Sequence, residues 1–344
     1  MRKNLFDKDL FDAGFFALGV NLAWLDGQYD HDLGKNEVTN HDLRTYDEQQ
    51  HKDNLDAYFK DISLMNARVV RYWVFERFEG IKFDQEGYAT GIDDGMMNNI
   101  ADVLHLARKY GLYLYLCLMD TWGVSVHSQE HLQRLNGMIL QEPRRRSFID
   151  NVLKPFVSDS RITSNRIFAI DVMNEPEGLY NSIWRAEMEW PDIINFIKEC
   201  TSAIHESSKF KVSCGFQHYQ TLMDNKDALN DLDFYDYHEY NNDGTLVPYD
   251  SLGLKKPCLI GECGQKDEKY DDKIQNKAVE GFLKNSWNNG YAGCLIWNYN
   301  YKGYEATDTN NRYSLITSKG EWRKATKALV NFSKKHRRNM LSEI

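Results

Sequence analysis

The sequence contains eight short apolar runs, separated by longer segments in which apolar residues recur at helical spacing. Each run is apolar at nearly every position and not at every second one, which is typical of strands covered on both faces. The runs comprise residues 14–22, 67–75, 112–119, 166–173, 210–216, 233–238, 257–262 and 292–297. This repetition constrains the fold most, because parallel strands need a long crossover, usually a helix, between them.

One intervening segment shows the helical pattern clearly. Residues 96–111 place Met97, Ile100, Leu104 and Ala107 on one face and close on a glycine. This spacing fits a helix with a single buried stripe, and the terminal glycine fits a helix stop. We therefore expect a helix that packs against the sheet.

Two further segments support the same arrangement. Residues 191–205 begin with a proline in a first-turn position, and residues 272–290 end on a glycine. Eight strands alternating with helices predict an α/β fold, a closed (β/α)8 TIM barrel, with residues 1–344 forming a single domain. A doubly wound open sheet is the alternative, but no GxGxxG loop follows the first run.

The charge balance bears on the binding partners. The chain has 42 basic and 51 acidic residues, a net charge of −9, so we expect neither nucleic acid nor a membrane surface as the partner. The sequence leaves the oligomeric state open.

The cysteines and the N-terminal residues bear on location. The six cysteines follow no disulfide or zinc spacing, which fits reduced thiols. Asp7, Asp9 and Asp12 stand where a signal peptide would need an apolar stretch. We expect a cytoplasmic protein, or a secreted one if a leader precedes these residues.

Polar and aromatic side chains stand at or just after the ends of most of the runs. In a TIM barrel the carboxyl ends of the strands carry the functional site. The residues at these positions are Asn21, Trp24, Arg71, Trp73, Asp120, Trp122, Asn174, Glu175, His238, Tyr240, Glu262 and Trp297. We expect these side chains to converge on one rim of the barrel.

Glu175 and Glu262 are the pair that carries chemistry. They end the fourth and seventh runs, about three βα units of roughly 30 residues apart, so they would face each other across the barrel mouth. Two carboxyl groups in that position are the equipment for glycoside hydrolysis.

The motifs around these residues resemble a known family. "VRYW" on the second run, "NEP" after the fourth, "HEY" at the sixth, "GE" ending the seventh and a tryptophan closing the eighth are similar to clan A retaining glycoside hydrolases. Among these, the chain is most similar to glycoside hydrolase family 5, which contains endo-glucanases and endo-β-mannanases. The resemblance extends over about residues 14–299.

The resemblance implies a role for each matching residue. Glu175 would be the general acid/base and Glu262 the nucleophile, with Arg71 orienting Glu262. The other matching positions would bind or shape the sugar: Asn174 at the 2-hydroxyl, His238 near Glu175, Tyr240 near Glu262, and Trp297 as the floor under the sugar that is cleaved.

The third run departs from the family pattern. Many family members place a His or Asn after this strand, whereas "LMDTW" places Asp120 there. A carboxylate suits a sugar hydroxyl, so we expect Asp120 to contact substrate. Trp24 and Trp122 can offer flat faces to sugar C–H surfaces.

These features predict a retaining β-glycosidase acting on oligo- or polysaccharide of the β-mannan or β-glucan type. We expect carboxyl groups about 5–5.5 Å apart, and a raised pKa for Glu175 caused by the charge of Glu262. No cofactor is expected, and "HEYNN" lacks the second histidine of a HExxH zinc site. A non-catalytic carbohydrate-binding barrel and a transglycosylase are the alternatives.

Three features remain open at this stage. Glu177 is expected to be either a solvated loop residue or a charge in the first turn of a helix, and Glu76 and Glu79 to lie on the loop after the second strand. Residues 29–42 form a long polar segment that either closes over one end of the cleft or is a surface loop.

Overall fold

The computed structural model describes most of the chain. The described residues are 15–25, 31–121, 130–162, 165–180, 188–266, 272–299, 313–317 and 319–336. Trp122, one of the expected substrate contacts, lies outside these ranges. Within them, no helix combines the length and apolar character needed to cross a bilayer.

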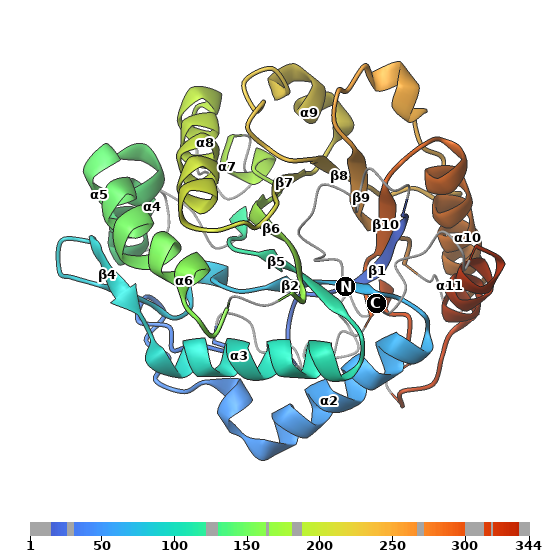
Figure 1. Ribbon diagram of the computed structural model, residues 1–344, viewed down its shortest axis with the longest axis horizontal. Coiled ribbons are helices and arrows are strands. Elements are labelled where there is room, and N and C mark those ends of the chain that lie inside the picture. The colour runs from blue at the N-terminus through green and yellow to red at the C-terminus, as the bar shows by residue number, and fades with distance from the viewer. Residues whose placement is uncertain are drawn as a thin grey trace, which may run out of the picture.

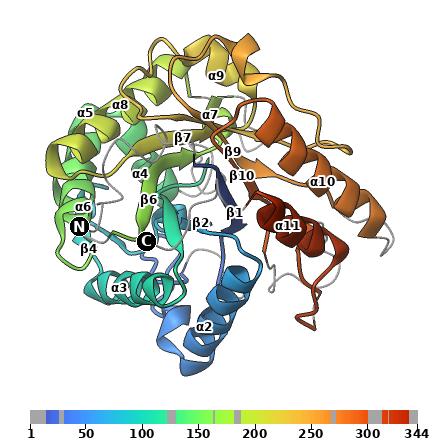
Figure 2. The ribbon, with the colours of Figure 1, turned by 45° about the vertical axis from the view of Figure 1, so that its right-hand side comes forward.

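Eight parallel strands close into a barrel, in the order β1-β10-β9-β8-β7-β6-β5-β2 (Figure 2). The strands are β1 (Ala17–Leu22), β2 (Val69–Trp73), β5 (Tyr113–Cys117), β6 (Ile167–Asn174), β7 (Val212–Phe216), β8 (Tyr235–Glu239), β9 (Cys258–Cys263) and β10 (Gly293–Ile296). Each strand coincides with one apolar run of the sequence. The TIM-barrel prediction is confirmed, and the open doubly wound sheet is excluded because β1 pairs with both β2 and β10.

Helices surround the strands (Figure 1). They are α2 (Gln49–Leu64), α3 (Asp94–Lys109), α4 (Glu130–Leu140), α5 (Glu142–Phe148), α6 (Lys154–Ser158), α7 (Glu177–Tyr180), α8 (Trp190–Ser207), α9 (Tyr219–Asn225), α10 (Asp272–Asn288) and α11 (Lys324–Lys335). The three helices expected from the sequence correspond to α3, α8 and α10.

Helix α3 shows why the sequence pattern was informative. The Asp93 side chain accepts a hydrogen bond from the Gly95 N–H, which caps the first turn. Gly111 follows the helix with φ of +67°, a conformation that glycine adopts without steric cost. Met97 and Ile100 are buried on the inner face.

One hairpin and several helices were not predicted from the sequence. The antiparallel strands β3 (Ile81–Phe83) and β4 (Ala89–Ile92) lie outside the barrel, between β2 and α3. They are three and four residues long, too short for a periodicity signal. Helix α2 could have been found, because Leu55, Tyr58, Phe59 and Ile62 follow helical spacing and are all buried.

The barrel interior has distinct layers. An apolar cluster of Ala17, Val69, Tyr113, Tyr115, Phe168, Ala169, Phe234, Leu259 and Leu295 fills the part toward the amino ends of the strands. A polar layer that includes Asn21, Arg71, Asp171 and Asp236, all buried, follows along the strands. Because the amino-end half is packed with side chains, the functional groups can lie only toward the carboxyl ends.

Candidate active site

Glu175 stands where the fourth barrel strand ends. It follows β6 directly, and its N–H donates to the Gly215 carbonyl at 2.7 Å. Its φ is +47°, a left-handed conformation that costs a non-glycine residue about 1–3 kcal/mol. Pro176 follows, and the short helix α7 begins at Glu177. This backbone directs a nearly buried carboxyl group into the barrel mouth.

Glu262 lies across the mouth on β9 and is held by two donors. Arg71 Nη1 lies 2.6 Å from Glu262 Oε1, and the Tyr240 hydroxyl donates to Oε2, also at 2.6 Å. Both are strong hydrogen bonds to a carboxylate. The predicted proximity of Arg71 and Tyr240 to Glu262 is therefore present in the structure.

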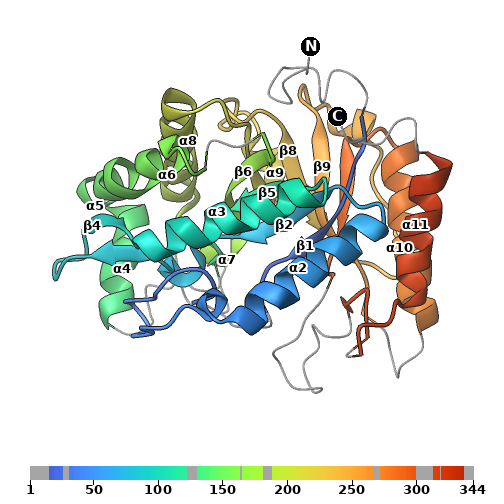
Figure 3. The same ribbon diagram turned by 60° about the horizontal axis from the view of Figure 1, so that its bottom comes forward.

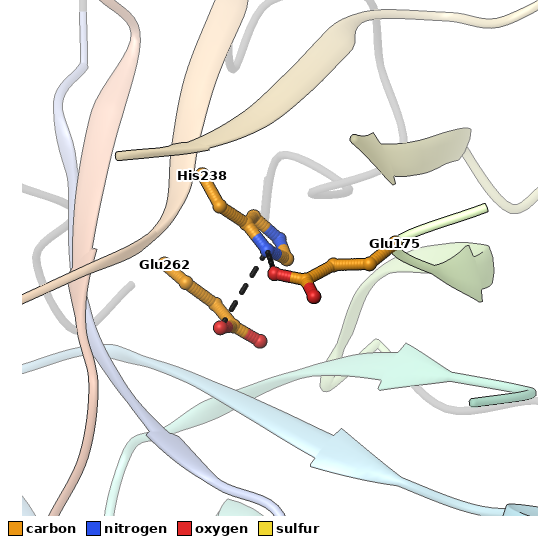
Figure 4. Close-up of side chains that lie close together, drawn as sticks. All are labelled: Glu175, His238 and Glu262. Atoms are coloured by element: carbon orange, nitrogen blue, oxygen red, sulfur yellow. Dashed lines mark hydrogen bonds and ion pairs between the residues drawn. The ribbon is translucent and has the colours of Figure 1, made fainter. Parts of the chain in front are cut away.

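His238 connects the two carboxyl groups. Its Nδ1 lies 2.8 Å from Glu175 Oε1 and 3.5 Å from Glu262 Oε2. Figure 4 shows the imidazole reaching toward both glutamates from β8. One atom of each of the three residues lies within 4.8 Å of the other two, a spacing that a divalent cation could also bridge.

Arg71 is the centre of the buried polar layer. Its side chain is fully buried and donates to Asp171 Oδ2 through Nε at 3.0 Å and Nη2 at 2.8 Å. It also contacts Asn21 and Asn174. With its guanidinium fixed on one side by Asp171, Arg71 can present Nη1 to Glu262 in a single orientation.

The sequence analysis did not identify Asp171, although one signal was available. Asp171 interrupts the apolar run "IFAIDVM", and a charge inside a buried strand requires a partner. Its Oδ1 accepts from the N–H groups of Gly215 and Met173, so both oxygens are satisfied. A Cβ on Gly215 would lie 2.9 Å from His238 Nε2, so this layer also needs a glycine.

A second aspartate of the polar layer, Asp236, has different hydrogen-bond partners and a raised pKa. Asp236 accepts a hydrogen bond from the Tyr115 hydroxyl at 2.9 Å and has no cation within hydrogen-bonding distance in the part of the chain that the structure describes. Burial and the nearby charge of Asp171 raise the pKa of Asp236 well above its usual value. The raised pKa favours the neutral form of Asp236, and Arg71 forms its ion pairs with Asp171 and Glu262.

Asn174 is oriented from both ends of its amide. Its Oδ1 accepts from Arg71 Nη2 at 2.8 Å, and its Nδ2 donates to Asp120 Oδ1 at 3.1 Å. Asp120 is buried. The contact seen for Asp120 is thus with Asn174, and its contact with a sugar stays a prediction.

Three tryptophans form one wall of the mouth. Trp24 packs edge-on against Trp73 and Trp297, with ring centroids 5.4 and 5.6 Å apart. The Trp24 indole N–H donates to Glu76 Oε1 at 2.7 Å. Glu76 does follow β2, as expected, but it is buried and fixes Trp24.

Glu177 fits one of the two alternatives expected from the sequence. It is the first residue of α7, so it is a first-turn helix charge and not a solvated loop residue, and it is buried and accepts from the N–H groups of Gln217 and His218. Gln217, which the sequence analysis did not identify, donates from Nε2 to Glu175 Oε2 at 3.3 Å. It follows the fifth barrel strand, β7, whose end was not among the positions considered.

The pKa values explain how the two glutamates can differ. Burial raises the pKa of Glu175 to about 7. The main cause is thus burial, and not the charge of Glu262 as expected. Burial raises the pKa of Glu262 too, but His238, Arg71 and the Tyr240 hydroxyl favour its ionised form. Burial lowers the pKa of His238 to about 4, so its imidazole is neutral at pH 7.

Two proteins of similar sequence are named mannan endo-1,4-beta-mannosidases. No family model matches the chain. It is 24% identical to a mannan endo-1,4-beta-mannosidase of Mytilus edulis, covering 82% of this chain and 83% of that protein. It is also 24% identical to a mannan endo-1,4-beta-mannosidase of Cryptopygus antarcticus, covering 89% and 86%.

A solved structure has a similar fold. The beta-1,4-mannanase of the sea hare Aplysia kurodai superimposes with a TM-score of 0.71 at 21% identity, covering 96% of both chains. The resemblance to clan A glycoside hydrolases stated from the sequence motifs is confirmed by these relatives.

Proposed function

We propose that this chain is a retaining glycoside hydrolase that cleaves β-1,4-linked mannan by double displacement. One observation carries the mechanism: carboxyl oxygens of Glu175 and Glu262 lie within 4.8 Å of each other. Inverting enzymes need about 6.5–9.5 Å between the carboxyl groups to admit a water, whereas about 5–5.5 Å allows direct attack on the sugar. The choice of mannan follows from the two relatives, which are mannan endo-1,4-beta-mannosidases.

In the first step Glu262 is the nucleophile. Its ionised carboxylate, held by Arg71 and Tyr240, forms a bond to the anomeric carbon while the bond to the leaving oxygen breaks. Glu175, whose raised pKa keeps a proton available near neutral pH, donates that proton to the leaving oxygen. The products are a glycosyl ester on Glu262 and a free sugar hydroxyl.

In the second step water replaces the ester. Glu175 is now a carboxylate and takes a proton from a water molecule as the water oxygen bonds to the anomeric carbon. The ester bond breaks, and its electron pair returns to Glu262 as a carboxylate. The neutral imidazole of His238 keeps Glu175 in place without adding a positive charge that would lower the pKa of Glu175.

The remaining site residues bind the sugar in this proposal. Asn174 meets the 2-hydroxyl, because its amide is already fixed by Arg71 and Asp120. Trp297 and Trp24 supply an apolar surface for the ring C–H groups. Tyr240, Asp120 and Trp122 are further proposed contacts.

The alternatives separate by product analysis. We expect purified protein to cleave β-1,4-manno-oligosaccharides with retention of anomeric configuration and to leave gluco- and xylo-oligosaccharides largely intact. A transglycosylase would yield products longer than the substrate at high acceptor concentration. A folded protein that binds manno-oligosaccharides without cleaving any of these substrates would overturn the proposal in favour of a carbohydrate-binding barrel.

Two further expectations, on the domain organisation and on the location of the protein, are also proposals. The chain forms one catalytic domain, which a single cooperative unfolding transition would support and two separate transitions would contradict. It resides in the cytoplasm, consistent with six unpaired cysteines; recovery of the native protein from the culture medium would contradict this.

A further inference from the structure

A second cavity lies away from the two glutamates. It has a volume of about 360 Å³ and is bounded by three segments: the stretch after β1, the β3–β4 hairpin and helix α4. These segments follow the carboxyl ends of β1, β2 and β5, which are neighbours in the barrel. The cavity therefore belongs to the same face of the barrel as Glu175 and Glu262. Figure 3 shows the hairpin and α4 close together on the side of the molecule that carries α3.

The walls of the cavity are held by hydrogen bonds within the protein. Glu79 accepts from the N–H groups of Leu33 and Gly34, and the Asn36 side chain donates to the Arg77 carbonyl at 3.0 Å. Glu79 was expected on a loop after β2, and it is in fact buried as the link between that loop and the segment after β1. The polar stretch noted in the sequence is thus a fixed wall over its described part.

Two carboxylates of the lining are engaged in shaping the cavity. Glu37 Oε2 accepts from the Phe83 N–H at 3.3 Å. Asp84 Oδ1 accepts from the N–H groups of Glu86 and Tyr88, both at 2.9 Å, which closes the hairpin turn. Together with Arg134, these groups leave the lining with a net negative charge, which disfavours an anion as occupant.

The floor is apolar and includes an aromatic ring. Val38 and Leu135 are buried, and Phe83 is half-buried. The Phe83 ring is braced edge-on by Phe78, with centroids 5.8 Å apart. A braced ring offers a flat surface at little entropic cost.

Three planar polar side chains on the lining have spare hydrogen-bonding capacity. Among the residues that the structure describes, the side chains of Asn40, Gln85 and Arg134 make no hydrogen bond or ion pair with protein. Amide and guanidinium groups can bond two adjacent hydroxyls at once. An apolar floor with such groups around it suits a neutral, hydroxyl-rich ring, and the volume lies in the range of about 300–1,000 Å³ usual for small-molecule sites.

We propose that this cavity is a second carbohydrate site, which binds a short stretch of the same β-linked mannan chain at a distance from the bond that is cleaved. The inference rests on the proposed function for the identity of the sugar. Its physical advantage is multivalency: a chain held at two sites leaves more slowly than one held at the active site alone. A substrate too short to reach both sites at once gains no such advantage in cleavage.

The test compares polymer with short substrate. We expect Phe83→Ala and Arg134→Ala each to lower kcat/KM for mannan polymer by about threefold to tenfold, the loss of one aromatic or bidentate contact. Their kcat/KM for an aryl β-mannobioside should equal that of the wild type. Lys82→Ala is the matched control, because Lys82 is exposed on the same strand and is not among the residues that line the cavity; it should leave both values unchanged.

Direct binding provides the second measurement. The inactive Glu262→Gln protein should bind mannotetraose at two sites in calorimetry, and adding Phe83→Ala should remove one of them. Equal losses on polymer and short substrate, or a single site that Phe83→Ala leaves intact, would overturn the second site. If the wild type cleaves neither substrate, the proposed function fails, and the calorimetric count still decides whether the cavity binds the sugar.

Discussion

Glu175 and Glu262 are the same residue type at similar depth, yet their surroundings differ in almost every respect. Glu262 sits within β9, where the pairing with β8 and β10 shifts register, and it accepts from a fully buried guanidinium and a tyrosine hydroxyl. Glu175 sits on a left-handed residue past a strand end, and its neighbours are a neutral imidazole and a side-chain amide 3.3 Å away. The comparison teaches that charge on one carboxyl group and a proton on the other are set by donors and burial, not by residue type.

The largest effect should come from removing the charged member of the pair. Glu262→Gln keeps the shape and the Tyr240 contact but cannot form the ester, so kcat should fall on the order of 10⁴–10⁶-fold. Steady-state assay on manno-oligosaccharide measures it, and circular dichroism confirms folding. A loss below tenfold would show that Glu262 is not the nucleophile.

Removing the protonated member should have a smaller and more selective effect. Glu175→Gln should lower kcat on mannan by about 10²–10⁴-fold, the usual worth of general acid catalysis. Substrates with activated leaving groups need no proton, so their first step should be spared, and added azide should restore turnover. Equal losses on activated and natural substrates would contradict the acid role.

The Asp171–Arg71 pair offers a way to change the pKa of Glu262 alone. In Asp171→Asn the charge of Arg71 acts on Glu262 without competition, which lowers the pKa of Glu262 and moves the acid limb of the kcat/KM profile to lower pH. Breaking this buried pair should also lower the unfolding free energy by about 3–5 kcal/mol.

Asp236→Asn is the matched control for that variant. Asp236 accepts from the Tyr115 hydroxyl and its raised pKa favours its neutral form, so an amide of the same shape should leave the acid limb in place. If Asp171→Asn only destabilises the fold and its profile matches that of Asp236→Asn, Asp171 does not position Arg71 for catalysis.

The smallest predicted effect is a pH dependence of the unfolding free energy that is caused by the titration of Glu175. Its pKa is about 7 in the folded chain against 4.5 unfolded, so the folded state binds more protons between these values. The stabilisation that this proton binding gives the folded state is present in full below pH 4.5 and is lost as the pH rises through 7. Glu175→Gln should flatten that slope in urea titrations at several pH values, and an unchanged slope would contradict the raised pKa.

Much of the fold was readable from the sequence because the strands are buried on both faces. Their apolar runs are continuous, and residues such as Glu175 and Glu262 break them at the ends, where a barrel places its site. Asp171 was missed although it interrupts one of these runs, since a run that is apolar at nearly every position does not say which side chains face the barrel interior. Its partner Arg71 lies 100 residues away, a pairing that spacing alone cannot reveal.

The other omissions have physical reasons as well. Glu177 reads as a solvated helix-start charge, and only the fold shows the two N–H groups from the β7 end that bury it. Strand β3 is too short to show a period, so the cavity beside Phe83 was invisible before the hairpin was seen. The main cause of the raised Glu175 pKa was also misjudged, because burial depends on packing.

The most direct test of the central claim is covalent trapping. A 2-deoxy-2-fluoro β-mannosyl or β-mannobiosyl donor with a good leaving group should glycosylate the enzyme once, and peptide mass spectrometry should place the sugar on Glu262. Labelling of Glu175, Asp120 or Asp171, or turnover of the natural substrate with inversion and no adduct, would contradict the assignment of the two carboxyl groups.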